Sequence, residues 1–299
     1  MRLPINVGVT GLRQARQHHC AQGRHGNLSM PGFENDYATY DFDITFEGSV
    51  ALVAFTDSHR HNLWSMPRMA QLTRLLRQLN ADDAVSAVLL HSGEGRSFGA
   101  GGSFHETSTF TGGNEVDVWI DHVTDLYIAA LQLNRPLIAA IDGYAIGIGL
   151  QIALTADYRI GSDRCVLKMP EFELGIACTF GGFMLEKIIG RSLMQNMLMS
   201  CDAWPAQRAM ADGLLHAVAD AGQLRTRALE QAHRAAAFTD AAFRNTKAYL
   251  NRDFIAGLEQ TRIAGKQAHR AAFAAGEAQG RMKAVLNRST AQPSVGAIS

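Results

Sequence analysis

The sequence predicts an α/β fold with a parallel sheet, and three patterns lead to this expectation. Short apolar stretches typical of buried strands alternate with longer amphipathic stretches typical of helices. Glycines mark the points where the chain turns from strand to helix. After Trp204 the chain becomes rich in Ala, Arg, Gln and Leu, which predicts a helical C-terminal region.

The early elements follow from local patterns. Asp41–Phe46 alternates polar and apolar residues, as a half-exposed strand does, and a Glu47-Gly48-Ser49 turn leads to a second strand, which makes a hairpin. Pro67 opens a helix with a regular apolar face. In chain order we expect strands at 41–46 and 50–55, a helix from 65, a strand at 85–90, a glycine-rich loop at 93–104 and an amphipathic helix at 116–133.

The central stretch begins at Pro136. Leu137–Ile141 is apolar throughout, which is typical of a strand buried on both faces. Gly147-Ile148-Gly149 then leads into an apolar helix at 150–156. The later elements expected are strands at 157–161 and 165–171, a helix through Leu185 and Ile189, and helices from 205 to 285 with one strand candidate at 215–218.

Composition limits the function classes. The 299 residues suffice for one large core, with or without a small added domain. Lys and Arg number 28, as do Asp and Glu, so the charge gives no reason to expect nucleic acid or an anionic membrane as partner. No apolar run approaches ~18 residues, so we expect no membrane span.

The two ends of the chain are polar. Residues 1–38 are basic and lack an apolar stripe, which predicts a flexible extension and no secretory signal. Residues 287–299 predict a flexible tail. The four cysteines are scattered without a Cys-x-x-Cys pair, so we expect free thiols and no metal site. The expected compartment is the cytoplasm.

Two glycine-rich junctions of the same kind occur, Ala100-Gly101-Gly102 and Gly147-Ile148-Gly149, each after a buried strand. Backbone N–H groups from both could converge on one oxygen, and one such donor can lower a barrier by about 3 kcal/mol. Either loop alone is explained by tight turns. A dinucleotide site is a poor alternative, because its third glycine position holds Ile152.

Over residues 42–286 the chain resembles the crotonase (enoyl-CoA hydratase/isomerase) superfamily. The resemblance is carried by Ser97–Phe104, Pro136–Gly149, Asp157–Ile160 and Met169–Gly175. It implies a ββα spiral core at 39–203, a helical C-terminal region at 204–286, and a homotrimer or hexamer. It also implies a coenzyme A thioester as substrate and no tightly bound cofactor. The amides that hold the thioester oxygen correspond to Gly102 and Ile148.

The expected carboxylates set the reaction type. A hydratase of this superfamily uses two glutamates, but the first position here is Gln151 and only the second, Glu171, is kept. An amide cannot exchange a proton at neutral pH, so concerted hydration is handicapped. One carboxylate with an oxyanion hole suits chemistry through a CoA enolate.

Within the superfamily the sequence is most similar to the carboxymethylproline synthases. That group decarboxylates malonyl-CoA to an enolate, which attacks the imine of pyrroline-5-carboxylate. Glu171 would orient the reacting partner or water, Gln151 and His269 would bind substrate carboxylates, and His61 and Ala100 complete the expected substrate contacts. Two positions depart from the pattern, Ser103 after the glycine pair and Ile148 where methionine is usual. The matching segments are 119–121, 125–127, 142–147, 151, 169–171, 175–176, 178, 245–247, 258–262, 268–269 and 271–273.

Each expected site residue also has an ordinary structural explanation: a capping carboxylate for Glu171, a packing histidine for His269, a buried structural amide for Gln151. Two other functions stay open, an enoyl-CoA hydratase or isomerase and a silent acyl-CoA-binding protein with residues 1–38 as an interaction arm. The residues do not identify the electrophile, nor decide between malonyl- and methylmalonyl-CoA.

Overall fold

The structure contains two sheets, and most neighbouring strands of the larger, six-stranded one run parallel. The computed structural model describes residues 41–93, 95–238 and 241–291. Among the described residues, the only antiparallel pair of strands in the larger sheet is the first one along the chain. In this pair Glu47 lies opposite Val50, which confirms the predicted hairpin. The strand order is β1 (Phe42–Glu47), β2 (Val50–Phe55), β3 (Ala87–Ser92), β5 (Leu137–Ile141), β7 (Tyr158–Ser162) and β10 (Ala217–Ala219).

Helices cover both faces of this sheet. Every residue of β2 and of β5 is buried, as the continuous apolar runs predict. One face joins the main core with α1 (Met66–Ala81) and α3 (Asn114–Leu131). The other face packs on α7 (Leu224–Ala236), which follows the short 3₁₀ helix η2 (Ala221–Gln223).

A second, smaller sheet lies next to the glycine-rich junctions. Its strands have only two or three residues each, too few for a recognisable pattern, so β4, β6 and β9 were not expected. Residues 93–104, predicted as a loop, contribute β4. The strand order is β4 (Gly99–Ala100), β6 (Tyr144–Ile146), β8 (Val166–Lys168) and β9 (Trp204–Pro205).

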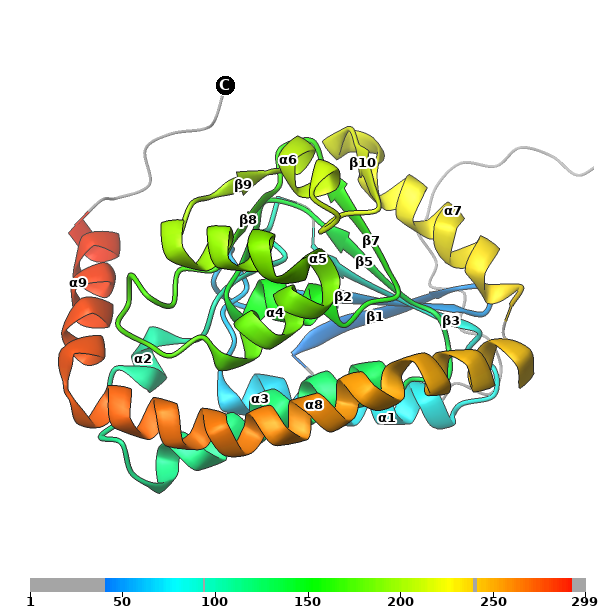
Figure 1. Ribbon diagram of the computed structural model, residues 1–299. Helices are drawn as coiled ribbons and strands as arrows, with labels where there is room; N and C mark the ends of the chain where they lie inside the picture. The colour runs from blue at the N-terminus through cyan, green and yellow to red at the C-terminus, as the bar shows by residue number, and fades with distance from the viewer. Residues whose placement is uncertain (1–40, 94, 239–240, 292–299) are drawn as a thin grey trace, which may run out of the picture. The chain divides into compact units, whose positions relative to one another are not determined.

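The C-terminal region is helical, as expected. The long helix α8 (Ala241–Ala274) runs alongside α3 and also packs on α5 (Thr179–Ser200) (Figure 1). After Gly276, α9 (Glu277–Ala291) turns away and contacts the single-turn α2 (Phe104–Thr107). Two shorter helices are α4 (Ile148–Leu154), which belongs to the core and is buried throughout, and α6 (Ala206–Ala211).

The predicted tail begins too early. Helix α9 continues to Ala291, so residues 287–291 are helical. Extending a formed helix by one residue costs little free energy, and the sequence has neither Gly nor Pro between residue 287 and Pro293. The predicted extension at 1–38 lies outside the described residues. In the described part of the chain no helix is long and apolar enough to cross a membrane.

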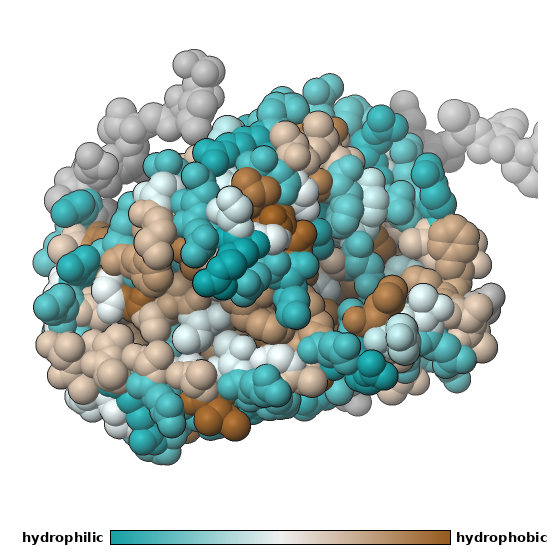
Figure 2. Space-filling view, in the orientation of Figure 1, coloured by the Kyte–Doolittle hydropathy of each residue, from teal (hydrophilic) through white to brown (hydrophobic). Residues whose placement is uncertain are grey.

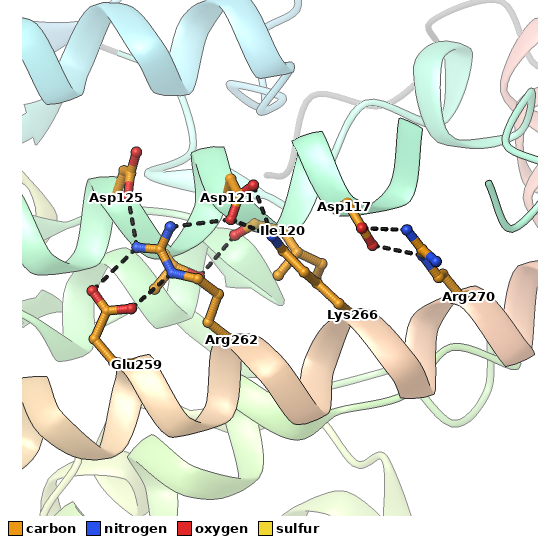
Figure 3. Close-up of polar contacts among 9 residues, drawn as sticks. Asp117, Ile120, Asp121, Asp125, Glu259, Arg262, Lys266 and Arg270 are labelled. Atoms are coloured by element: carbon orange, nitrogen blue, oxygen red, sulfur yellow. Dashed lines mark hydrogen bonds and ion pairs between the residues drawn. The ribbon is translucent and has the colours of Figure 1, made fainter. Parts of the chain in front are cut away.

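Ion pairs fix α8 against α3. Arg262 donates to Asp121 and Asp125 at 3.1 and 2.7 Å, and Lys266 donates to Asp121 at 2.8 Å (Figure 3). One turn further, Arg270 pairs with Asp117. The three cations of α8 and the three carboxylates of α3 are each spaced by one turn, so the two helices are paired along several turns. Each partly exposed pair contributes little stability, but together they hold α8 alongside α3.

Candidate active site

The two glycine-rich junctions meet through β4 and β6. The strands pair in parallel, with Gly99 opposite Ala145. The backbones of Gly99 and Gly149 touch, because a Cβ added at Gly149 would lie 2.2 Å from the Gly99 carbonyl oxygen. Only glycine fits at that approach. The structure therefore brings together the two loops that the sequence singled out.

Two backbone amides at this junction are free to bind a ligand. Gly102 lies opposite Trp64 in a parallel bridge whose bonds use Gly101 and Ser103, so its own N–H points to the other side. Ile148 is the first residue of α4, and first-turn amides have no partner within a helix. Gly147 before it has φ +52°, a conformation that favours glycine.

These amides lie at a cavity of about 90 Å³ with mostly apolar walls. On the face that carries α5 and α8, apolar side chains line a recess in the surface (Figure 2). Six of the seven expected site residues line the cavity: Ala100, Gly102, Ile148, Gln151, Glu171 and His269. Trp119, Thr179, Phe180 and Gly181 also line the cavity.

Glu171 follows β8 and lies beside the second junction, since a Cβ added at Gly147 would be 3.3 Å from its Oε1. Oε1 accepts a 3.1 Å hydrogen bond from Gln151. Oε2 is buried without a well-aligned hydrogen-bond partner among the described residues. Burial raises the pKa of this carboxyl to about 7, although its own amide, the Cys178 thiol and Gln151 lower it. Glu171 can therefore exchange a proton near neutral pH.

Gln151 joins Glu171 to the core. The buried hydroxyl of Tyr127 donates to Gln151 Oε1 at 2.7 Å, which turns the amide nitrogen toward Glu171 and toward the sulfur of Met169. Burial and the charge of Glu171 raise the pKa of Tyr127 well above its usual value, so it stays a donor. The amide is thus fully bonded within the protein. Binding of a substrate carboxylate by Gln151 remains a prediction.

Comparison with known proteins agrees with this geometry. The family model described as Enoyl-CoA hydratase/isomerase matches residues 45–292. A carboxymethylproline synthase from Pectobacterium carotovorum subsp. carotovorum is 40% identical over 80% of this chain and 96% of its own. The solved structure of ThnE from S. clavuligerus is 46% identical with a TM-score of 0.67, over 76% of this chain and all of that one. A short-chain enoyl-CoA hydratase from Clostridium acetobutylicum is 25% identical over 81% of this chain and 93% of its own.

The chain belongs to the enoyl-CoA hydratase/isomerase family, the crotonases. Its two sheets and helical C-terminal region are a crotonase fold, as the sequence resemblance implied. Crotonases act on CoA thioesters, so the cavity between Gly102, Ile148 and Glu171 is the candidate active site of this enzyme.

His269 reaches the cavity of this crotonase from α8 and is 4% exposed. Its Nδ1 lies 2.8 Å from the Gly265 carbonyl oxygen, which can only accept, so that nitrogen carries the proton of the neutral ring. Burial lowers the pKa of His269, although the backbones of Gly265 and Ala177 raise it. A neutral ring has no second proton to offer a carboxylate. The expected role of His269 in carboxylate binding therefore needs an ionised form that burial opposes.

His61 does not line the cavity. Its Nδ1 is 2.8 Å from the hydroxyl of Ser97, and its ring packs 5.4 Å from that of Tyr144. Its backbone oxygen accepts the amide of Ala100 at 2.9 Å and so supports β4. A contact of the His61 side chain with substrate remains a prediction. No group of three or more described residues has the composition and spacing of a metal site.

Three residues at this crotonase site, Tyr127, Trp119 and Thr179, were not predicted from the sequence as functional candidates. Tyr127 and Trp119 lie on the apolar face of α3, so periodicity assigns them to the core. Thr179 stands in a glycine-rich stretch with no pattern of its own. Only the fold brings Tyr127 to Gln151, and only the cavity identifies Trp119 and Thr179.

Proposed function

We propose that this crotonase decarboxylates malonyl-CoA and joins the resulting enolate to the imine carbon of pyrroline-5-carboxylate or a similar cyclic imine. The observation that carries the proposal is Gln151, an amide bonded to Tyr127 and Glu171 where a hydratase has a second carboxylate. The single remaining carboxylate disfavours hydration and suits an enolate. The 40% identity to a carboxymethylproline synthase supports the same assignment.

In the first step the thioester oxygen accepts the amides of Gly102 and Ile148. The bond between the α-carbon and the free carboxylate breaks, its electron pair forms the enolate, and carbon dioxide leaves. The two N–H donors stabilise the negative oxygen, and each can contribute about 3 kcal/mol. The apolar wall of the cavity keeps water from protonating the enolate.

In the second step the enolate carbon forms a bond to the imine carbon, the electron pair of the C=N π bond moves to the nitrogen, and that nitrogen takes up a proton from solvent. Carboxymethylproline, the product named for the relative, is a free acid, so a thioester product must then be hydrolysed. Water attacks the thioester carbon, its proton passes to Glu171, and the CoA thiolate leaves. A carboxyl with a pKa of about 7 suits this proton transfer at neutral pH.

Mass spectrometry of reactions with malonyl-CoA tests the proposal. We expect slow formation of acetyl-CoA alone, and free CoA with a carboxymethyl adduct when pyrroline-5-carboxylate is present. Acetyl-CoA without an adduct would restrict the activity to decarboxylation. Unchanged malonyl-CoA in both reactions would reject the proposal and favour a silent acyl-CoA-binding protein.

An enoyl-CoA hydratase is the second candidate, and the relationship to the Clostridium acetobutylicum enzyme favours it. We expect the wild type to hydrate crotonyl-CoA slowly or not at all, and Gln151→Glu to hydrate it at least about tenfold faster. The substitution places a second carboxylate near Glu171 Oε1, 3.1 Å from the present amide nitrogen, so that one of the two can act as acid. Absorbance at the enoyl thioester band measures the rate.

Gln151→Met is the matched control for that experiment, because it keeps the length of the side chain without an ionisable group. Fast hydration by the wild type would instead show that Gln151 is no obstacle, and the hydratase assignment would then be preferred. Equal rates for Gln151→Glu and Gln151→Met would contradict the expected role of the second carboxylate.

We also propose a homotrimer or hexamer, the assembly that the resemblance to crotonases implied. Large apolar side chains are exposed on α5 and α8, including Met199 at 74% and Ile263 at 66%. Exposed apolar side chains of this size support contacts with further subunits.

A further inference from the structure

The cavity contains buried polar atoms that the chemistry above does not use. Three side chains line it with a buried atom that has no hydrogen-bond partner among the described residues: Glu171 Oε2, Trp119 Nε1 and Thr179 Oγ1. Glu171 already has a role. The indole N–H only donates, and a hydroxyl can donate. Buried polar groups are nearly always paired, so these two donors indicate a ligand that accepts hydrogen bonds.

One of the two donors, Thr179, lies at the amino end of α5. Thr179 is the first residue of this helix, which runs without a break to Gly190. The preceding Cys178 makes no side-chain capping bond, and first-turn amides have no partner within the helix. Phe180 and Gly181 of the same turn also line the cavity. A helix amino end with free N–H groups favours an anion.

Trp119 lines the same cavity from α3. It is 7% exposed, and its ring lies 5.3 Å from that of His269. His269 bonds to Gly265 one turn earlier, and a Cβ added at Gly265 would lie 3.1 Å from Thr179 Oγ1. Trp119 and Thr179 therefore both lie next to the turn of α8 that runs from Gly265 to His269.

The charge of the wall limits the ligand. Neither Lys nor Arg is among the residues that line the cavity, so an anion there would be held by neutral donors and the helix. Neutral donors of this kind suit a small anion with one charge, such as a carboxylate. The carboxylate of malonyl-CoA is lost as carbon dioxide, and donors that stabilise it would oppose its loss. A ring carboxylate of the second substrate persists into the product.

We propose that Thr179, Trp119 and the first turn of α5 bind the carboxylate that the second substrate retains through the reaction. In naming that substrate a cyclic imino acid, the inference rests on the proposed function. The site selects an electrophile that carries a carboxylate over the same imine without one, because only the former satisfies these donors.

Thr179→Val tests this subsite, because valine keeps the shape and loses the hydroxyl. The readout is the ratio of kcat/KM for pyrroline-5-carboxylate to that for 1-pyrroline, which lacks the carboxylate. We expect the ratio to fall at least about tenfold in Thr179→Val, as for loss of a hydrogen bond to a charged group. Thr179→Ser keeps the hydroxyl and should retain the wild-type ratio. Thr124→Val is the matched control, since its buried hydroxyl donates to the backbone carbonyl of Ile120 and Thr124 does not line the cavity.

An unchanged ratio in Thr179→Val would overturn the subsite and leave the proposed function standing. Should the wild type fail to form the adduct, equilibrium binding decides the question separately. L-proline and pyrrolidine differ only in the carboxylate, and both are titrated against the protein with acetyl-CoA. Tighter binding of proline that is lost in Thr179→Val supports the subsite, and equal binding of both amines by the wild type overturns it.

Discussion

Glu171→Ala is expected to lower turnover of the CoA thioester by about 10²–10⁴-fold, the usual contribution of a positioned acid or base. Affinity for the thioester should change little, because its oxygen is held by backbone amides and its apolar part by the cavity wall. Release of free CoA, followed with a thiol reagent, measures turnover. Calorimetric titration with acetyl-CoA measures affinity.

Glu173→Ala is the matched control, since Glu173 lies two residues away, is exposed, and pairs with Lys168 at 2.8 Å. It should retain wild-type turnover. The pH profile gives a second check. Because burial raises the pKa of Glu171 to about 7, its basic form fills as pH rises through 7, and the hydrolysis rate should rise with it and then level. Undiminished turnover in Glu171→Ala, or a profile without this rise, would contradict the assignment.

Gly149→Ala is expected to separate the two junctions. The added methyl group would lie 2.2 Å from the Gly99 oxygen and 2.6 Å from the Gly99 carbonyl carbon, both backbone atoms that cannot turn aside. Moving α4 away from β4 would pull the Ile148 amide from the Gly102 amide. Loss of one oxyanion donor costs about 10²–10³ in kcat. We also expect a fall of about 1–3 kcal/mol in the free energy of unfolding from overpacking.

Gly182→Ala provides the comparison. It makes the same substitution in α5, where an added Cβ would meet Leu198 at an ordinary 3.5 Å. Alanine is a better helix former than glycine, so this variant should be as stable as the wild type or more so. Urea denaturation measures the stability of both variants. A Gly149→Ala protein with wild-type stability and turnover would show that the junction tolerates a wider separation.

The parts of the fold that depend on local pattern were predictable. The apolar run of Leu137–Ile141 is a strand buried on both faces, and the glycine-rich junctions meet as expected. Glu171 and Gln151, which the sequence placed at one site, lie side by side at the cavity. These expectations combined periodicity, glycine spacing and a family resemblance, all of which are properties of short segments.

The rest depends on contacts between distant segments. β4 has two residues and exists only because β6 pairs with it. The bond from Tyr127 to Gln151 spans 24 positions and joins two helices, so neither residue alone reveals it. His269 was expected to bind a carboxylate, but whether its ring has a free proton depends on the Gly265 carbonyl one turn away. Such details of hydrogen bonding follow from packing.

The attachment of α8 to α3 by ion pairs bears on how this enzyme can diversify. The reacting atoms meet Gly102, Ile148 and Glu171, whereas α8 brings His269 and Phe273 to the same cavity from about a hundred residues later in the chain. The ion pairs with α3 are made by other side chains than these two. Substitutions on the cavity side of α8 can therefore change which second substrate is accepted, while the helix keeps its place and the chemistry stays intact.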